Sequence, residues 1–111
     1  MHVGHICEVE EEPVDMGEGT YIQWLITEKE GALNYIMRRF IIKPGGYIKK
    51  HNHPYEHEIY VIKGKGIIGH EKRGEIEVSA GSFAFIEPDV THWYRNIGDE
   101  DWEFICIIPK L

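Results

Sequence analysis

Short runs of β-branched and aromatic residues, with almost no helical periodicity between them, constrain the fold of this chain most strongly. Ile, Val, Phe, Tyr and Trp favour extended strands because their side chains pack well on a pleated surface. Gly, Pro, Asn and Asp, which accept turn dihedrals, stand between the runs. The expected strands are residues 21–27, 35–42, 58–62, 66–70, 75–78, 82–86, 92–95 and 102–108.

Turn residues separate these strands, and nothing in the chain resembles a linker, a repeat or a low-complexity tract. Eight short strands in 111 residues suit one closed or sandwiched β domain. We therefore expect an all-β fold with a single domain over residues 1–111. The expected turns are residues 30–31, 44–46, 63–65, 72–74, 87–89 and 96–99.

The charge and the cysteines of the chain indicate which partners and which cellular compartment to expect. The formal net charge is -7 and no basic stripe is present, so neither nucleic acid nor an anionic membrane surface is an expected partner. The first residues are acidic and lack the apolar core of a signal peptide, and the chain has no run of about 18 apolar residues. Cys7 and Cys106 lie at opposite ends and form no Cys-x-x-Cys pair. These features predict a cytoplasmic protein.

The last expected strand is apolar on both of its faces. Alternate residues from Trp102 to Ile108 share one face, while Ile105 and Ile107 put apolar surface on the other. A strand of this kind is covered on both sides. We expect a homodimer to provide the outer cover, with a folded-back segment such as residues 21–26 as the alternative.

Four histidines in two clusters are the features that carry chemistry. His51 and His53 are two residues apart, so on an extended chain both imidazoles project from the same face. His57 follows after a proline that bends the path, and His92 stands after a Glu-Pro-Asp turn at the start of another strand. Neutral imidazole is the commonest metal ligand in proteins. The four side chains therefore predict one metal site assembled by folding.

The first histidine cluster matches a known motif. The cupin superfamily has glycine, five residues, His-x-His, three or four residues, glutamate, six residues and glycine, which corresponds here to Gly45, His51, His53, His57 and Gly64. The departure is His57, where most cupins have glutamate. Glu58 is the competing occupant of that position, but only His57 leaves six residues before Gly64.

The second cluster matches the second cupin motif, which ends in a histidine, three residues and an asparagine. Gly81, His92 and Asn96 fit it, while Glu87 and Asp89 replace its proline and glycine. With motif 1 at residues 45–64 and motif 2 at residues 81–96, the chain resembles a cupin. The resemblance implies a double-stranded β-helix, the small cupin jelly roll.

The stretches NYIMRRF, HNHPYEHEIYVIKGK and FIEPDVTHWYRN resemble small single-domain cupins that bind manganese through four histidines. That likeness implies His51, His53, His57 and His92 as the ligands of one divalent metal ion. It also implies a cavity around the ion and oxidative cleavage of alkenes such as isoeugenol-type phenylpropenes. The residues that the likeness places around this cavity are Arg38, Tyr94, Phe104 and Cys106.

Four neutral ligands leave the charge of a divalent ion to be offset by something else, which favours an anionic fifth ligand. Four neutral ligands and a thiol in the cavity suit redox chemistry better than simple proton transfer, and an obvious buried general base is missing. We therefore expect a metal-dependent oxygenase, of dioxygenase type, acting on a small phenolic, enolic or alkene substrate. The alternatives are a metal-dependent isomerase or epimerase of sugars or keto acids, and a non-catalytic module that binds a metal or a small ligand. Manganese is the expected ion, with iron, copper, nickel and zinc as alternatives.

Several residues have a structural interpretation beside the functional one. Cys106 also suits the role of a small buried hydrophobe, and Tyr94 and Phe104 also suit the core. Arg38 alternates with apolar residues and would put a cation on an apolar face, which requires an anionic partner such as a substrate or a glutamate. If the strand register is reversed, Arg38 points outward instead. The remaining histidines have no partner at ligand spacing and are expected at the surface; they are His2, His5 and His70.

Overall fold

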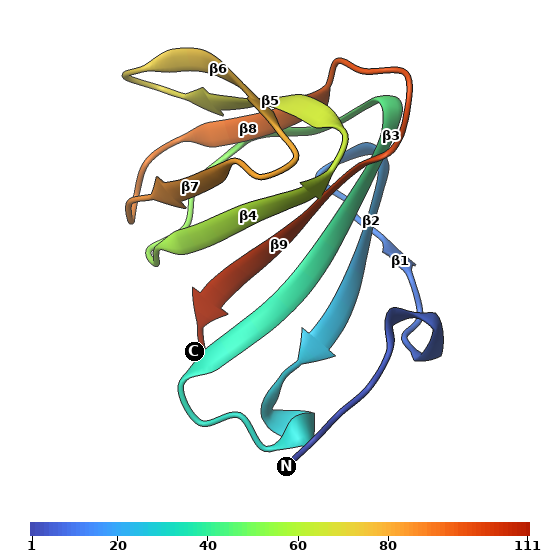
Figure 1. Cartoon of the computed structure of the whole chain (residues 1–111). Coiled ribbons are helices and arrows are strands. Elements are labelled where there is room, and N and C mark those ends of the chain that lie inside the picture. Colours follow the sequence, from blue (N-terminus) through green and yellow to red (C-terminus); the bar gives the residue numbers. More distant parts are fainter.

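The strand-forming runs assemble into one antiparallel sheet that curls into a nearly closed barrel, as the computed structural model of residues 1–111 shows (Figure 1). The sheet order is β6-β5-β8-β3-β9-β4-β7, with β2 added to β3 and β1 added to β2. Two short 3-10 helices, η1 (Ile6–Glu8) and η2 (Glu28–Glu30), complete the chain. The strands are β1 (Glu12–Pro13), β2 (Gly17–Ile26), β3 (Tyr35–His51), β4 (His57–Lys63), β5 (Lys65–His70), β6 (Gly74–Ser79), β7 (Phe83–Ile86), β8 (His92–Asn96) and β9 (Trp102–Pro109).

The expected all-β jelly roll is confirmed, and the expected strands correspond to β2 to β9. The short strand β1 lies outside them, because two residues carry no alternation that a sequence pattern can detect. Neither of the two short helices is long and apolar enough to cross a membrane.

Strand β3 differs most from its expected length. The turn expected at residues 44–46 is wrong, because the strand continues through this segment to His51. The chain bends there without ending, and Gly45 supports the bend with a φ of 79°. Before the bend β3 pairs with β9, and after it β3 pairs with β8 (Figure 1). The glycines and proline therefore mark a corner of the barrel where one strand changes partners.

Alternate residues of the strands fill the barrel. The inward face of β9 begins at Trp102, which is fully buried, and continues through Phe104 and Cys106. Across the ladder, Phe40 of β3 stacks on Phe104 with ring centroids 5.3 Å apart. Burial of these rings supplies the main stabilising free energy of the domain.

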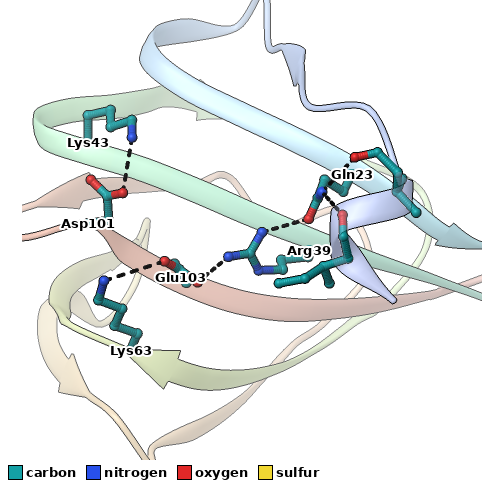
Figure 2. A network of polar contacts seen from close by, with 8 residues as sticks. Gln23, Arg39, Lys43, Lys63, Asp101 and Glu103 are labelled. Carbon is teal, nitrogen blue, oxygen red and sulfur yellow. Dashed lines mark hydrogen bonds and ion pairs between the residues drawn. The ribbon is translucent and has the colours of Figure 1, made fainter. Parts of the chain in front are cut away.

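The outward face of the same sheet carries a polar network (Figure 2). Arg39 donates to Glu103 on β9 and to the amide oxygen of Gln23 on β2, the latter at 2.6 Å. The Gln23 amide nitrogen in turn donates to the carbonyl oxygens of Ile6 and Val9, at 2.9 and 2.8 Å. This network attaches the N-terminal segment and η1 to the outer face of the barrel.

The outer face of β9 beyond this network is only half covered. Ile105 and Ile107 are half-buried. Tyr60, the partner of Ile105 on β4, and Phe83, the partner of Tyr60 on β7, are exposed. Residues 21–26 lie in β2, which pairs with β3 in the same sheet and does not cover β9. The homodimer stays a prediction.

Strand β5 approaches the core so closely that it tolerates no side chain at Gly66. A Cβ atom there would lie 2.3 Å from Cε3 of Trp102. We expect Gly66→Ala to lower the free energy of unfolding by about 1–3 kcal/mol, the usual cost of overpacking a core. Chemical denaturation measures this loss. Gly98→Ala is the matched control, because its Cβ would meet nothing closer than Lys65 Cγ at 3.4 Å, and an equal loss in both variants would contradict the packing argument.

Candidate functional site

Four histidine rings gather at one end of the barrel. His51 ends β3 and lies opposite His92, the first residue of β8, in the antiparallel ladder. His57 begins β4, and His53 lies in the loop between β3 and β4. The ring centroids of His51 and His92 are 4.2 Å apart, and those of His57 and His92 are 5.0 Å apart. His53 lies 5.0 Å from His51 and 5.3 Å from His57 by the same measure.

Backbone carbonyls orient two of these rings. His51 Nδ1 lies 2.7 Å from the carbonyl oxygen of Lys49, and His92 Nδ1 lies 2.9 Å from that of Val90. A carbonyl oxygen only accepts, so each Nδ1 carries the proton and each Nε2 keeps a lone pair. Such carbonyl contacts are the usual supports of metal-binding histidines.

Burial keeps the cluster uncharged. The pKa of His57 is lowered to about 3 and that of His92 to about 4, mainly because both rings lose hydration. Neighbouring imidazoles contribute to both shifts and Arg38 contributes to that of His57, while the carbonyl of Val90 opposes the shift of His92. The pKa values of His51 and His53 are lowered for the same main reason. All four imidazoles are therefore neutral near pH 7, which is the state that binds metals.

The donor set fits a transition metal ion, although the rings do not form a finished coordination shell. As the side chains stand, no group of three or more His, Cys, Asp or Glu is arranged to hold an ion. Two imidazoles on one ion have ring centroids at most about 6.4 Å apart, from metal–nitrogen bonds of about 2.1 Å. Five of the six ring pairs in the cluster lie within that limit, and the most separated of these five is His53 and His92, at 6.2 Å. Nδ1 of His57 and Nε2 of His92 are buried without hydrogen-bond partners, so both atoms are free for a ligand.

One contact that the sequence did not predict ties the two motifs together. Asp89 has a φ of 64°, and its backbone N–H donates to the carbonyl oxygen of His53 at 2.7 Å. The second cupin motif has glycine at this position, and Asp is one of the few other residues that tolerate a left-handed backbone. The departure from the motif therefore preserves the turn that positions the His53 loop.

Three of the clustered histidines, His51, His53 and His57, line a cavity of about 320 Å³ inside the barrel. Its wall is mostly apolar, with Met16, Ile22 and Phe40 among the lining residues. An outer cavity of about 650 Å³ adjoins it, and Trp24 and Tyr55 line both. The spacing of Tyr55 two residues after His53 was a usable signal for its position, whereas nothing in the sequence marked Trp24 as a lining residue.

Three of the four expected cavity residues line this space, namely Arg38, Tyr94 and Cys106. Phe104 instead packs behind the wall, against Phe40 and Tyr94. Arg38 points inward, and its Nη2 donates to Cys106 Sγ at 3.0 Å.

Both polar groups beside Arg38 stay protonated near neutral pH. Burial raises the pKa of the Cys106 thiol, and Arg38 opposes that shift only in part. Burial also holds the pKa of the Tyr94 hydroxyl well above its usual value. The cavity therefore offers a thiol and a phenol as hydrogen-bonding groups, and neither group is an anion.

The other polar residues of the two motifs have structural contacts. Glu58 is exposed on the outward side of β4, where its ladder partner is Phe85. The buried amide of Asn96 donates to the carbonyl oxygens of Ile42 and Glu100, both at 2.8 Å, and so holds the turn before β9.

The remaining histidines stand apart from the cluster. His70 accepts from the Lys72 N–H at 3.1 Å through Nδ1, so its Nε2 donates to Glu87. Both ring nitrogens are thereby occupied. His2 and His5 are exposed on the N-terminal segment.

The barrel, the two motifs and their turn geometry agree with a comparison against known families. A family model described as a cupin domain matches residues 38–108. The chain belongs to the cupin family. The match begins at Arg38 and includes all four clustered histidines.

Several proteins with different names are similar to this cupin. An oxalate-binding protein of Thermotoga maritima is 30% identical over 98 residues, which are 86% of this cupin and 80% of that protein. The polyketide synthase CurC of Streptomyces cyaneus is 31% identical over 109 residues, which are 96% of this cupin and 70% of that protein. The polyketide cyclase RemF of Streptomyces resistomycificus superposes with a TM-score of 0.92 at 28% identity, covering 98% of this cupin and 79% of RemF.

The lowered histidine pKa values make the stability of the metal-free cupin depend on pH. The unfolded chain binds protons on these imidazoles near pH 6.5, whereas folded His57 and His92 do so only near pH 3 and pH 4. Protons therefore favour the unfolded state as the pH falls below 6.5. We expect the free energy of unfolding to decrease from pH 6.5 toward pH 4, and less steeply in His92→Gln. Urea titrations at several pH values measure it, and identical slopes in the two proteins would contradict the pKa assignment of His92.

Proposed function

We propose that this cupin is a metal-dependent oxygenase that acts on a small phenolic, enolic or alkene substrate. The observation that carries the proposal is the cluster of four neutral histidines at the edge of a mostly apolar cavity. His51, His53, His57 and His92 would hold one divalent ion per subunit. Manganese is the first candidate, and iron, copper, nickel and zinc compete for the same ligands because imidazole does not discriminate strongly among them.

A bound ion would supply Lewis acidity and a place for dioxygen, and the protein would supply orientation and a dry environment. In an octahedral ion, four protein ligands leave two positions, whereas a tetrahedral ion would have none. The carbonyls of Lys49 and Val90 hold two imidazoles in one tautomer. Phe40, Ile22 and Met16 exclude water from the substrate side.

The composition of the cavity favours an oxygenase over an isomerase or epimerase. Proton-transfer catalysis needs a group that accepts a proton near neutral pH. Tyr94 and Cys106 both have raised pKa values, so neither is a ready base. Glu12 on β1 is the only carboxylate among the lining residues, and it is exposed.

Two alternatives draw support from the relatives. Polyketide synthases and cyclases handle enolisable carbonyl compounds, so the likeness to CurC and RemF favours non-oxidative enolate chemistry as the second candidate. The likeness to an oxalate-binding protein favours a binding module as the third. All three candidates use the same cavity.

Metal content tests the four-histidine site directly. We expect about one divalent ion per subunit of untagged protein and at least tenfold less in His92→Ala, because one of four ligands is lost. Elemental analysis measures the ion, and circular dichroism checks that the β fold is intact. His70→Ala is the matched control, since His70 is the residue opposite His92 on β5 but has both ring nitrogens engaged elsewhere. Unchanged metal content in folded His92→Ala would remove the site.

The reaction type is tested with isoeugenol and the manganese-loaded protein. We expect one dioxygen consumed per alkene cleaved, with the two oxygen atoms divided between two carbonyl products. An oxygen electrode measures the uptake, and mass spectrometry after ¹⁸O₂ locates the atoms. Metal-loaded His70→Ala should behave like the unmodified protein, and His92→Ala should be inactive. Entry of solvent deuterium into an enolisable substrate such as acetylacetone, without dioxygen uptake, would instead support the isomerase-like alternative.

A further inference from the structure

Two consecutive buried arginines on β3 have opposite environments. Arg38 and Arg39 are each 8% exposed and point to opposite faces of the strand. Arg39 faces outward, where it is paired with the carboxylate of Glu103 and donates to the amide oxygen of Gln23, although its Nε has no partner (Figure 2). Arg38 faces the cavity and takes part in no ion pair. One buried cation is therefore neutralised within the chain and the other is not.

The contacts of Arg38 hold its guanidinium without neutralising it. Its carbon Cζ lies 5.1 Å from the ring centroid of Phe40 and 5.7 Å from that of Trp24. Its Nη2 donates to Cys106 Sγ, a weak acceptor that burial keeps protonated, and its Nε is buried with no partner. The aromatic faces and the β9 thiol fix the orientation of the group, while donors remain free.

Burying an unpaired cation costs free energy unless a partner arrives. No carboxylate forms an ion pair with Arg38, and the four clustered histidines are neutral. Glu12 on β1 is the only carboxylate that lines this cavity, and it is exposed. A bound divalent ion would add further positive charge to the same cavity. Both sources of charge attract a ligand that carries negative charge, and the free guanidinium donors match the paired oxygens of a carboxylate or an enolate.

We propose that Arg38 is the anion-binding and specificity-determining residue of the cavity, and that the cavity accepts a small organic carboxylate or enolate with a flat apolar body. The anionic oxygens would lie between the guanidinium and the histidines. The body would lie against the apolar wall beside Trp24, which also lines the outer cavity. This inference deepens the proposed function and rests on it for the identity of the reacting site, but binding at Arg38 needs no metal ion.

Isothermal titration with benzoate and its neutral isostere benzamide tests this inference, first on the metal-free protein and then on the manganese-loaded protein. Both probes have one flat ring, and only benzoate offers a charged pair of oxygens. We expect benzoate to bind at least about tenfold more tightly in the metal-free protein, the usual advantage of a charged hydrogen-bonding partner. Equal affinity, no binding, or a preference for benzoate only in the loaded protein would overturn the assignment to Arg38.

Variants separate Arg38 from the rest of the cavity. Arg38→Gln, which keeps a donor but no charge, should bring the affinities for benzoate and benzamide within about twofold, while Arg38→Lys should keep part of the preference because its charge lacks the guanidinium fork. Arg39→Gln is the matched control and should keep the full preference, because its side chain lies on the outer face. A full preference in folded Arg38→Gln would overturn the proposal. If Arg38→Gln does not fold, the Arg38→Lys variant and the comparison of isosteres on the unmodified protein decide it.

Failure of this inference is distinguishable from failure of the proposed function. A protein that binds no metal and consumes no dioxygen, yet prefers benzoate through Arg38, would be a binding module with the anion site intact. A protein that consumes dioxygen with isoeugenol but does not distinguish benzoate from benzamide would keep the oxygenase and lose the anion site.

Discussion

The antiparallel pairing of β3 with two different strands is the constraint on which the rest of the structure depends. Before the bend at residues 44–46, β3 pairs with β9, and Arg38 lies opposite Cys106. After the bend it pairs with β8, and His51 lies opposite His92. One strand thus supplies both the cation and a histidine of the cluster. Because the backbone ladder fixes these pairs, a slip of one residue would turn both side chains to the outer face.

The alternation along β3 also explains how the fold tolerates two adjacent buried arginines. The outward one lies beside the N-terminal segment and Glu103, which the fold provides as a permanent partner. The inward one lies among aromatic rings, where each unmet donor carries a desolvation cost. Functional sites commonly hold such costs, since a residue selected for stability alone would be apolar at this position. A ligand that accepts hydrogen bonds from Arg38 would recover part of this desolvation cost as binding free energy.

The fold and the grouping of the histidines were predictable because they depend on short-range patterns. Strand runs, turn residues and the spacing of two motifs are local properties, and the β-barrel follows from closing such strands against each other. The corner at residues 44–46 was not predictable as a continuing strand, since Pro-Gly-Gly has the composition of a turn and only the neighbouring strands decide otherwise. The contact of Asp89 with His53 and the inward direction of Arg38 depend on how the strands pair in the folded protein. The alternation of residue types in the sequence does not determine that pairing. Trp24 lines the cavity because β2 pairs with β3, and no feature of the sequence predicted this pairing.

The chemistry of the cavity follows from its charge balance more than from any single residue. The four imidazoles are neutral, the Arg38 guanidinium has no ion-pair partner, and the only carboxylate that lines the cavity, Glu12, is exposed. A bound divalent ion would add to the positive charge of the cavity. A ligand with two anionic oxygens could contact both the Arg38 guanidinium and an ion held by the histidines. These two contacts would then determine its orientation. With the apolar wall as a third point of contact, the carbon next to the anionic group would be held beside the histidines, where a bound ion would act on it. On the proposal made above, the buried cation would then decide both which ligand the cavity binds and which bond of that ligand lies beside the histidines.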